Sequence, residues 1–145
     1  MAKNSTKKTL TFKKFLKLYQ GLALIPIDKK DALSASVIDF VANCEHLVER
    51  YNKKRNIIFR DTASLDEDGN FFLDKNGKPD FYKVSKANME QRELKLDKLL
   101  IEEVELEPCI TNDTRRVLGL PYDVIKLYNG WLWNIDLQND IKNEE

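Results

Sequence analysis

The sequence predicts a mainly α protein built on an antiparallel two-helix hairpin with a small β-hairpin tip, plus short N- and C-terminal helices. Apolar residues recur every three or four positions through one long central segment, which is the spacing of a helix packed along a partner helix. A second segment of strong helix formers follows, and two glycine-containing turns lie between the two segments. The chain has only five glycines and four prolines, which argues against an all-β fold rich in tight turns. For a chain of 145 residues we expect a single domain, 1–145.

Residues 1–9 are predicted to form a basic arm, because the first twenty residues contain six lysines and no acid. The candidates for electrostatic contact with a partner, or with a second copy of the chain, are Lys7, Lys8, Lys13 and Lys14. Thr11 is the expected cap of a helix that ends at Gly21 and has an apolar stripe of Phe12, Phe15, Leu16 and Tyr19. Pro26 prevents a helix through the apolar residues 22–27, which we expect to be packed core.

The strongest helical signal starts at one of two alternative caps, Asp28 or Asp31, and continues to about Phe59. Its apolar residues are separated by four, three, four, three, four and then seven positions: Leu33, Val37, Phe40, Cys44, Leu47, Tyr51 and Ile58. Such a helix is roughly 45 Å long at about 1.5 Å per residue. Charged and amide residues gather in its second half, so we expect that half to extend into solvent.

A second helix is predicted from Lys86 to Glu103, with Ser85 as its cap. Its apolar residues Met89, Leu96, Leu99 and Leu100 keep helical spacing, although Arg92 and Glu93 leave a polar gap. Residues 29–103 therefore form the predicted hairpin, with its β tip at 65–84. Val104 and Leu106 then indicate a short extended segment whose other face presents three solvated acids, the candidate electrostatic contacts Glu103, Glu105 and Glu107.

The C-terminal segment, 108–145, is predicted to be helical. Thr111 or Asp113 caps a short helix ending at Gly119, and Pro121 begins another that Asn129 and Gly130 terminate. Two tryptophans follow at a spacing that gives them one face in an extended segment. Trp131 and Trp133 are interpreted as core, with partner contacts as the alternative. We find no internal repeat.

The tip contains two turn dipeptides, Asp68-Gly69 and Asn76-Gly77, and two short apolar segments that favour strands at 71–73 and 81–84. An isolated hairpin is barely stable, so its aromatic residues must cover a helix or contact a partner. The candidate partner contacts here are Phe71, Phe72, Phe81 and Tyr82. A calcium loop using Asp66, Asp68, Asn70 and Asp74 is the alternative. Counting from Asp66 puts Gly77 at position 12, where an EF-hand requires Glu, and counting from Asp68 puts Phe72 at position 5, so the pattern fails in both registers.

No catalytic chemistry is indicated, so we expect a protein that is not an enzyme, with no catalytic residues, no metal site and no cofactor. The chain has one histidine, and in Cys44-x-His46 the two side chains belong to different faces of a helix. Phosphate-binding and hydrolase motifs are missing from the sequence. Basic and acidic residues number 24 each, so nucleic acid is not an expected partner. No signal peptide or spanning segment is recognisable, and two apolar-context cysteines fit a reducing cytoplasm.

A long charged helix, the turns DEDGN and DKNGK, and a second helix running into LLIEEVELEP together resemble an uncharacterised family of small bacteriophage proteins, matched over about residues 30–107. The family is defined only as a domain of unknown function, so it supplies no catalytic residues. The resemblance implies a phage origin and a non-enzymatic role. The missing catalytic chemistry, the separated opposite charges and the two-helix arm lead to the hypothesis of a phage protein that acts by protein–protein contacts, as a virion structural or assembly component in the host cytoplasm or in the particle. The alternatives are a small inhibitor of a host defence or transcription protein, and a metal-dependent enzyme using Asp66, Asp68 and Asp74.

Overall fold

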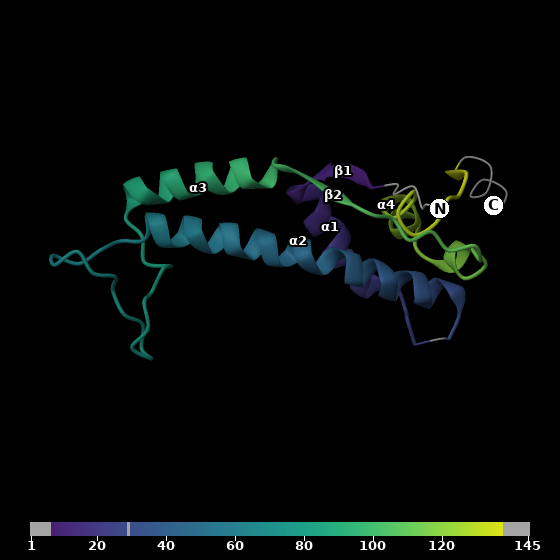
Figure 1. The fold of residues 1–145 in the computed structure, drawn as a ribbon, viewed down its shortest axis with the longest axis horizontal. Coiled ribbons are helices and arrows are strands. Elements are labelled where there is room, and N and C mark those ends of the chain that lie inside the picture. Colours follow the sequence, from purple (N-terminus) through teal and green to yellow (C-terminus); the bar gives the residue numbers. More distant parts are fainter. Residues whose placement is uncertain (1–6, 29, 138–145) are drawn as a thin grey trace. The chain divides into compact units, whose positions relative to one another are not determined.

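A computed structural model describes residues 7–28 and 30–137 of the chain, and it confirms a mainly α fold with one small antiparallel sheet (Figure 1). The elements in order are β1 (Lys8–Thr11), α1 (Phe12–Gly21), the 3-10 helix η1 (Leu22–Leu24), α2 (Ala32–Thr62), α3 (Lys86–Leu100), β2 (Glu103–Leu106), the 3-10 helix η2 (Val117–Gly119) and α4 (Tyr122–Leu127).

The chain divides into two compact units. Unit 1 comprises the residues up to His46 together with those from Glu103 onward, and unit 2 comprises Leu47–Glu102. Helix α2 contributes its first half to unit 1 and its second half to unit 2.

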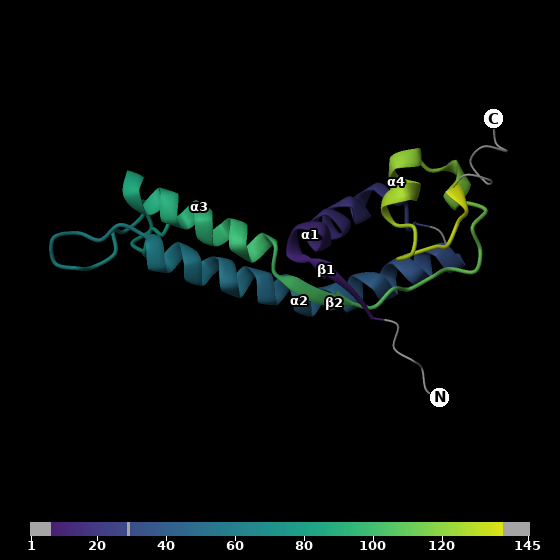
Figure 2. The same ribbon diagram turned by 90° about the horizontal axis from the view of Figure 1, so that it is seen from above.

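The two-stranded sheet belongs to unit 1 and joins the start of the chain to its last third (Figure 2). Strands β1 and β2 are antiparallel, with Leu10 opposite Val104 and Lys8 opposite Leu106. The predicted extended segment at Val104–Leu106 is confirmed, with both side chains buried. The prediction of a basic arm through residue 9 is wrong at its end, because Lys8 and Thr9 are in β1; residues 1–6 of the arm lie outside the described residues.

Helix α1 begins and ends as predicted. Thr11 accepts a hydrogen bond of 3.1 Å from the backbone N–H of Lys14, which caps the first turn. Its buried residues are Phe12, Phe15 and Leu18, so Leu18 belongs to a stripe in which Leu16 and Tyr19 are only half-buried. In the connector that follows, Leu22 and Ile25 are buried, but Leu24 and Ile27 are 63% and 48% exposed, so the prediction of a fully packed 22–27 is wrong.

Helix α2 is capped by Asp31, whose carboxylate accepts a hydrogen bond of 2.9 Å from the N–H of Ser34. The first five residues of the predicted seam, Leu33, Val37, Phe40, Cys44 and Leu47, are all buried. Tyr51 and Ile58, further along, are half-buried. The four-three periodicity therefore identifies the buried face of α2 correctly, and the face becomes more exposed where the helix enters unit 2.

The core of unit 1 forms where α1 and α2 meet the C-terminal segment. Tyr128 donates its hydroxyl proton to the carbonyl of Leu18, and its ring contacts that of Trp133 with 6.0 Å between centroids. The Trp133 indole donates to the carbonyl of Ile125 at 2.9 Å. Trp131 packs on Phe40, with 6.1 Å between ring centroids. Trp131 and Trp133 are only 6% and 0% exposed, so their interpretation as core is confirmed and the alternative of partner contacts is wrong.

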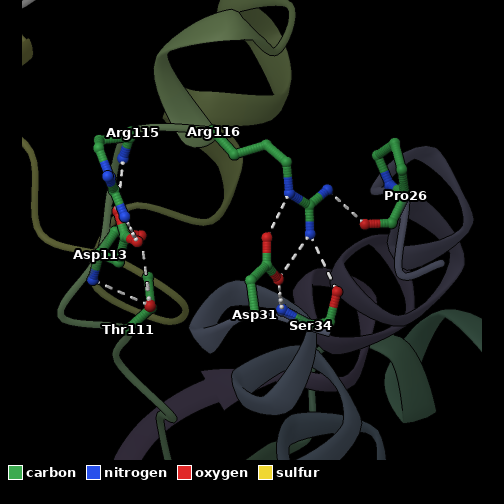
Figure 3. A network of polar contacts seen from close by, with 7 residues as sticks. All are labelled: Pro26, Asp31, Ser34, Thr111, Asp113, Arg115 and Arg116. Atoms are coloured by element: carbon green, nitrogen blue, oxygen red, sulfur yellow. Dashed lines mark hydrogen bonds and ion pairs between the residues drawn. The ribbon is translucent and has the colours of Figure 1, made fainter. Parts of the chain in front are cut away.

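Arg116 anchors the start of α2 to the C-terminal segment (Figure 3). Its guanidinium donates to both carboxylate oxygens of Asp31 at 2.8 and 3.0 Å, to Ser34 Oγ at 2.9 Å and to the carbonyl of Pro26 at 2.6 Å. The neighbouring Asp113 accepts from the backbone and side chain of Arg115. Asp113 therefore closes a turn, and the predicted helix from Thr111 or Asp113 to Gly119 is wrong except for the single turn η2.

Candidate protein-binding surface

Unit 2 consists of two antiparallel helical segments and the loop that joins them. Figure 1 and Figure 2 both show α3 beside the second half of α2. Lys54 of α2 forms an ion pair with Glu102, just beyond α3. Near the end of α2, the carbonyl of Phe59 accepts a hydrogen bond from Arg92 of α3. The Ser85 hydroxyl accepts from the N–H of Asn88 at 3.2 Å and caps α3 as predicted. The predicted antiparallel helical hairpin is confirmed.

Arg92, which the sequence placed in a polar gap of the helix, is the most buried charged side chain of unit 2 at 3% exposed. It donates to Thr62 Oγ1 at 2.8 Å and to the carbonyls of Phe59 and Phe81 at 2.9 and 2.6 Å. Phe59 O is one of the last four carbonyls of α2, which have no backbone N–H of the regular helical pattern to pair with. Burial lowers the pKa of Arg92, and the positive charge of Arg55 lowers it further. Arg92 thus joins the end of α2, α3 and the loop at one point.

The loop contains two consecutive turns of the same construction, eight residues apart: LDEDGNFF at 65–72 and LDKNGKPD at 73–80. Asp66 Oδ1 accepts from the N–H groups of Asp68 and Asn70, both at 2.9 Å. Asp74 Oδ1 accepts from those of Asn76 and Lys78 at 2.8 and 3.0 Å. Each turn is closed by one antiparallel bridge, and each has its glycine at positive φ, 82° and 77°. The sequence therefore contains an internal repeat, and the prediction that it has no repeat is wrong.

This repeat also corrects the predicted tip. Leu65 bridges to Phe71 and Leu73 to Pro79, so a turn at Asn76-Gly77 is confirmed. The predicted strands at 71–73 and 81–84 do not form, because the chain turns again at Asp80, which accepts from the N–H of Tyr82. The only named strands in the described residues are β1 and β2.

The four aromatic residues predicted as partner contacts differ in exposure. Phe71 and Phe81 pack edge to face with 5.1 Å between centroids, and both are half-buried. Phe72 lies under the ammonium of Lys83, which is 4.1 Å from its ring centroid. Tyr82 contacts the ring of Phe59 with 5.4 Å between centroids, yet it remains 72% exposed. Tyr82 alone among them offers most of its ring to a partner.

Unit 2 buries few apolar side chains and exposes many. Its buried apolar residues are Leu47, Ala63 and Leu99. Its large apolar residues that are at least 39% exposed are Ile57, Leu65, Leu73, Tyr82, Met89, Leu94 and Ile101. Leu65 and Leu73 occupy the same position in the two turns. We use the name tip surface for the exposed side chains of Leu65, Leu73 and Tyr82, which are 51%, 65% and 72% exposed. Sequence reasoning missed both leucines because it followed the aromatic residues.

A groove of about 370 Å³ lies between the two helices of unit 2. It is lined by residues of α2, residues of α3 and Glu102, which lies two residues beyond the end of α3. The lining residues are Lys54, Ile57, Ile58, Lys95, Lys98, Leu99 and Glu102. Sequence periodicity predicted that these helices pack together but gave no indication that one side of the contact stays open.

In comparisons with known proteins, the chain matches no family model, and it has no significant match to a curated protein or to a solved structure. The resemblance to a phage family stays a prediction. Within the described residues, no helix combines the length and apolar character needed to cross a membrane.

The charged residues predicted as electrostatic contacts lie in unit 1. Lys7, Lys8, Lys13 and Lys14 are exposed, as are the three glutamates at 103, 105 and 107. The β1–β2 pairing puts Thr9 opposite Glu105 and Thr11 opposite Glu103, so the basic and acidic segments adjoin within one molecule. Lys8 Nζ lies 4.4 Å from the ring centroid of Trp131 and donates to Gly130 O at 3.1 Å. Lys8 therefore already has an intramolecular role.

The chemical alternatives are also placed by the structure. Cys44 is buried, which raises the pKa of its thiol to about 12, whereas His46 is exposed, so the two face different ways as predicted. Asp66 and Asp74 hold their own turns through the hydrogen bonds above. Among the described residues, no three His, Cys, Asp or Glu side chains gather in a way that could hold a metal ion.

Proposed function

We propose that this chain is a non-enzymatic bacteriophage protein that binds another protein through unit 2, as a structural or assembly component of the virion. One observation carries the binding role: unit 2 leaves seven large apolar side chains exposed while it buries three apolar residues. Apolar surface of this kind is stabilised when a partner removes it from water. The phage origin is supported by the resemblance of residues 30–107 alone.

The charge of unit 2 favours a protein over a nucleic acid as the partner. Between Leu47 and Glu102 there are twelve Lys and Arg and eleven Asp and Glu, so the surface has no strong overall field. The tip surface is apolar and displayed on a loop held in place by turn hydrogen bonds and by Arg92. A preformed loop of this type loses little conformational entropy when it binds.

The test is whether the tip surface is needed for incorporation into particles. The variant Leu65→Ser/Leu73→Ser/Tyr82→Ser removes that surface, and Leu24→Ser/Ile38→Ser/Tyr122→Ser removes exposed apolar residues of unit 1 as a matched control. Mass spectrometry of purified virions should detect the wild type and the control but not the tip variant. Equal incorporation of all three would contradict binding through the tip surface.

Absence of the wild-type chain from purified particles would contradict the virion role. A host protein that is then bound by the wild type and the control, but not by the tip variant, would indicate the inhibitor instead.

A further inference from the structure

The groove between α2 and α3 is lined by apolar and basic side chains. Ile57, Ile58 and Leu99 form its apolar part, and Ile57 is 47% exposed. Lys54, Lys95 and Lys98 supply three ammonium groups against a single carboxylate, that of Glu102. That carboxylate is already paired with Lys54. Lys95 and Lys98 have no ion pair with any described residue.

The apolar surface continues from the groove onto the outer side of α3. Leu94, Lys98 and Ile101 are spaced at i, i+4 and i+7, so they follow one another along one face of the helix. Leu94 is 61% exposed and Ile101 is 68% exposed. Removal of such apolar side chains from water is favourable in free energy, so a complex with a partner that covers them would be stabilised. Lys98 belongs both to this stripe and to the groove lining. The stripe and the groove therefore make one surface with two exposed lysines in it.

Two packed helices leave open the side on which a third helix would complete a bundle. Helical domains reach a stable core when each apolar stripe is covered by another element, and three or more helices are the usual solution. In unit 2 Leu47, Leu99 and Arg92 are buried, while Ile57, Leu94 and Ile101 stay exposed. A helix lying in the groove would cover these three with its own apolar face, through interdigitation of side chains.

We propose that this groove binds an acidic amphipathic helix of a partner protein. The proposal rests on the proposed protein-binding function and adds a second contact face of unit 2, distinct from the tip surface, together with the chemistry of the partner segment that binds there. The partner helix presents apolar residues at i, i+3 or i+4 and i+7 to Ile57, Ile58 and Leu99. Asp or Glu residues beside that stripe pair with Lys95 and Lys98. Recognition of one helix in a groove by this spacing is a common mode of peptide binding, and the lysines set its specificity by charge.

The probe is a surface-display library of sixteen-residue helices, with Leu fixed on one face and Glu, Gln or Lys varied at the positions flanking it. Selection uses the whole chain as wild type, as Lys95→Glu/Lys98→Glu, and as Lys75→Glu/Lys78→Glu. The last variant is the matched control, because it makes the same charge change on the exposed second turn of the loop. Circular dichroism verifies the helical content of each variant before selection.

The wild type and the control should enrich peptides rich in Glu, whereas the groove variant should enrich peptides rich in Lys. Selected acidic peptides should bind the groove variant at least about tenfold more weakly than the control. Selection of no peptide, equal use of Glu and Lys, or unchanged binding to the groove variant would each overturn the proposal. The tip variant Leu65→Ser/Leu73→Ser/Tyr82→Ser keeps the groove, so acidic peptides should still bind it; the outcome for the groove is thus separate from that for the proposed function.

Discussion

The guanidinium of Arg92 donates a hydrogen bond of 2.8 Å to the hydroxyl of Thr62, the last residue of α2. The same hydroxyl donates to the carbonyl of Ile58 at 2.7 Å, so the hydroxyl links Arg92 to the last turn of the helix. Positive charge at a helix C-terminus is favoured by the dipole of the backbone. Arg92 also faces the ring of Phe59, which has Arg55 at an equal distance of 4.2 Å from its centroid. The buried guanidinium of Arg92, which has no carboxylate partner among the described residues, is therefore held by carbonyls, a hydroxyl and an aromatic ring.

Replacing Arg92 with Met should reduce the free energy of unfolding by about 3 kcal/mol, because it removes the nearest donor to the carbonyl of Phe59 and the donor to the carbonyl of Phe81, both in part-buried positions. Arg92→Lys should cost about half as much, since an ammonium keeps the charge but cannot reach three acceptors as a planar fork does. Urea unfolding followed by circular dichroism measures both. Arg60→Met is the control: Arg60 is exposed, and its contact with Asp61 is 4.0 Å long. A loss at Arg92 no larger than that at Arg60 would show that the burial of Arg92 is not stabilising.

Gly21 is required for the close approach of α1 to Tyr128. A Cβ on Gly21 would lie 2.5 Å from the Tyr128 hydroxyl, which is bonded to the carbonyl of Leu18. Gly21→Ala should therefore cost about 1–3 kcal/mol by overpacking. Gly119→Ala is the matched control, because nothing lies within 4 Å of its added Cβ. Thermal unfolding of the two single variants compares them.

Removing the hydroxyl tests the cause. In the Tyr128→Phe background the nearest atom to the new Cβ is gone, so Gly21→Ala should cost much less than in the wild type. If the effects of the two substitutions on the free energy of unfolding are additive, contact with the Tyr128 hydroxyl is not the cause of the destabilisation by Gly21→Ala.

The elements that sequence reasoning located are those whose signals are local. The seam from Leu33 to Leu47 and the caps Thr11, Asp31 and Ser85 depend on neighbours within one or two turns, and the structure agrees with them. The pairing of β1 with β2 joins Lys8–Thr11 to Glu103–Leu106. Nothing within four residues of either strand indicates the other, so the pairing could not be predicted.

Arg92 was misplaced for a different reason. Hydrophobic patterning assigns a charged residue to the solvent face, and the acceptors that make its burial possible are backbone carbonyls of Phe59 and Phe81, which any sequence would supply. The repeat of LDEDGNFF and LDKNGKPD is visible in the sequence and was missed, because Asp68-Gly69 and Asn76-Gly77 were predicted as two separate turns without comparison of the residues around them. Aligning the Asp-x-Asx-Gly units would have placed Leu65 and Leu73 at equivalent positions.

Acid should weaken unit 1 through Asp31. The guanidinium of Arg116 holds the pKa of Asp31 well below its ordinary value of 3.8, and the N–H of Ser34 lowers it further. Since the pKa is lower in the folded state, this stabilisation is complete above the unfolded pKa and is lost as the pH falls through the folded pKa. Asp31→Asn keeps an oxygen to cap α2 but removes the charge. Its urea midpoint should lie below that of the wild type at about pH 7, and the difference should shrink at about pH 2.

Asp113→Asn serves as the comparison for that experiment. Arg115 lowers the pKa of Asp113 to about 2, but the Arg115 side chain is 91% exposed, so water screens their attraction. The midpoint should change less than for Asp31→Asn. A difference between Asp31→Asn and the wild type that stays constant with pH would show that the charge of Asp31 is not the stabilising feature.

The two turns of the loop should respond alike to loss of their aspartates. Asp66→Ala and Asp74→Ala each remove an oxygen that accepts from two backbone N–H groups, those of residues 68 and 70 or of residues 76 and 78. Each loss should cost about 1 kcal/mol of local stability and make these amides exchange with deuterium roughly fivefold faster. Exchange should change in the altered turn and not in the other, because every one of these bonds lies within one turn.

Asp66→Asn keeps an acceptor oxygen and should exchange nearly as the wild type does. Millimolar calcium should leave the wild-type exchange unchanged; slower exchange of both turns with calcium would mean that the aspartates bind the ion as well as the backbone.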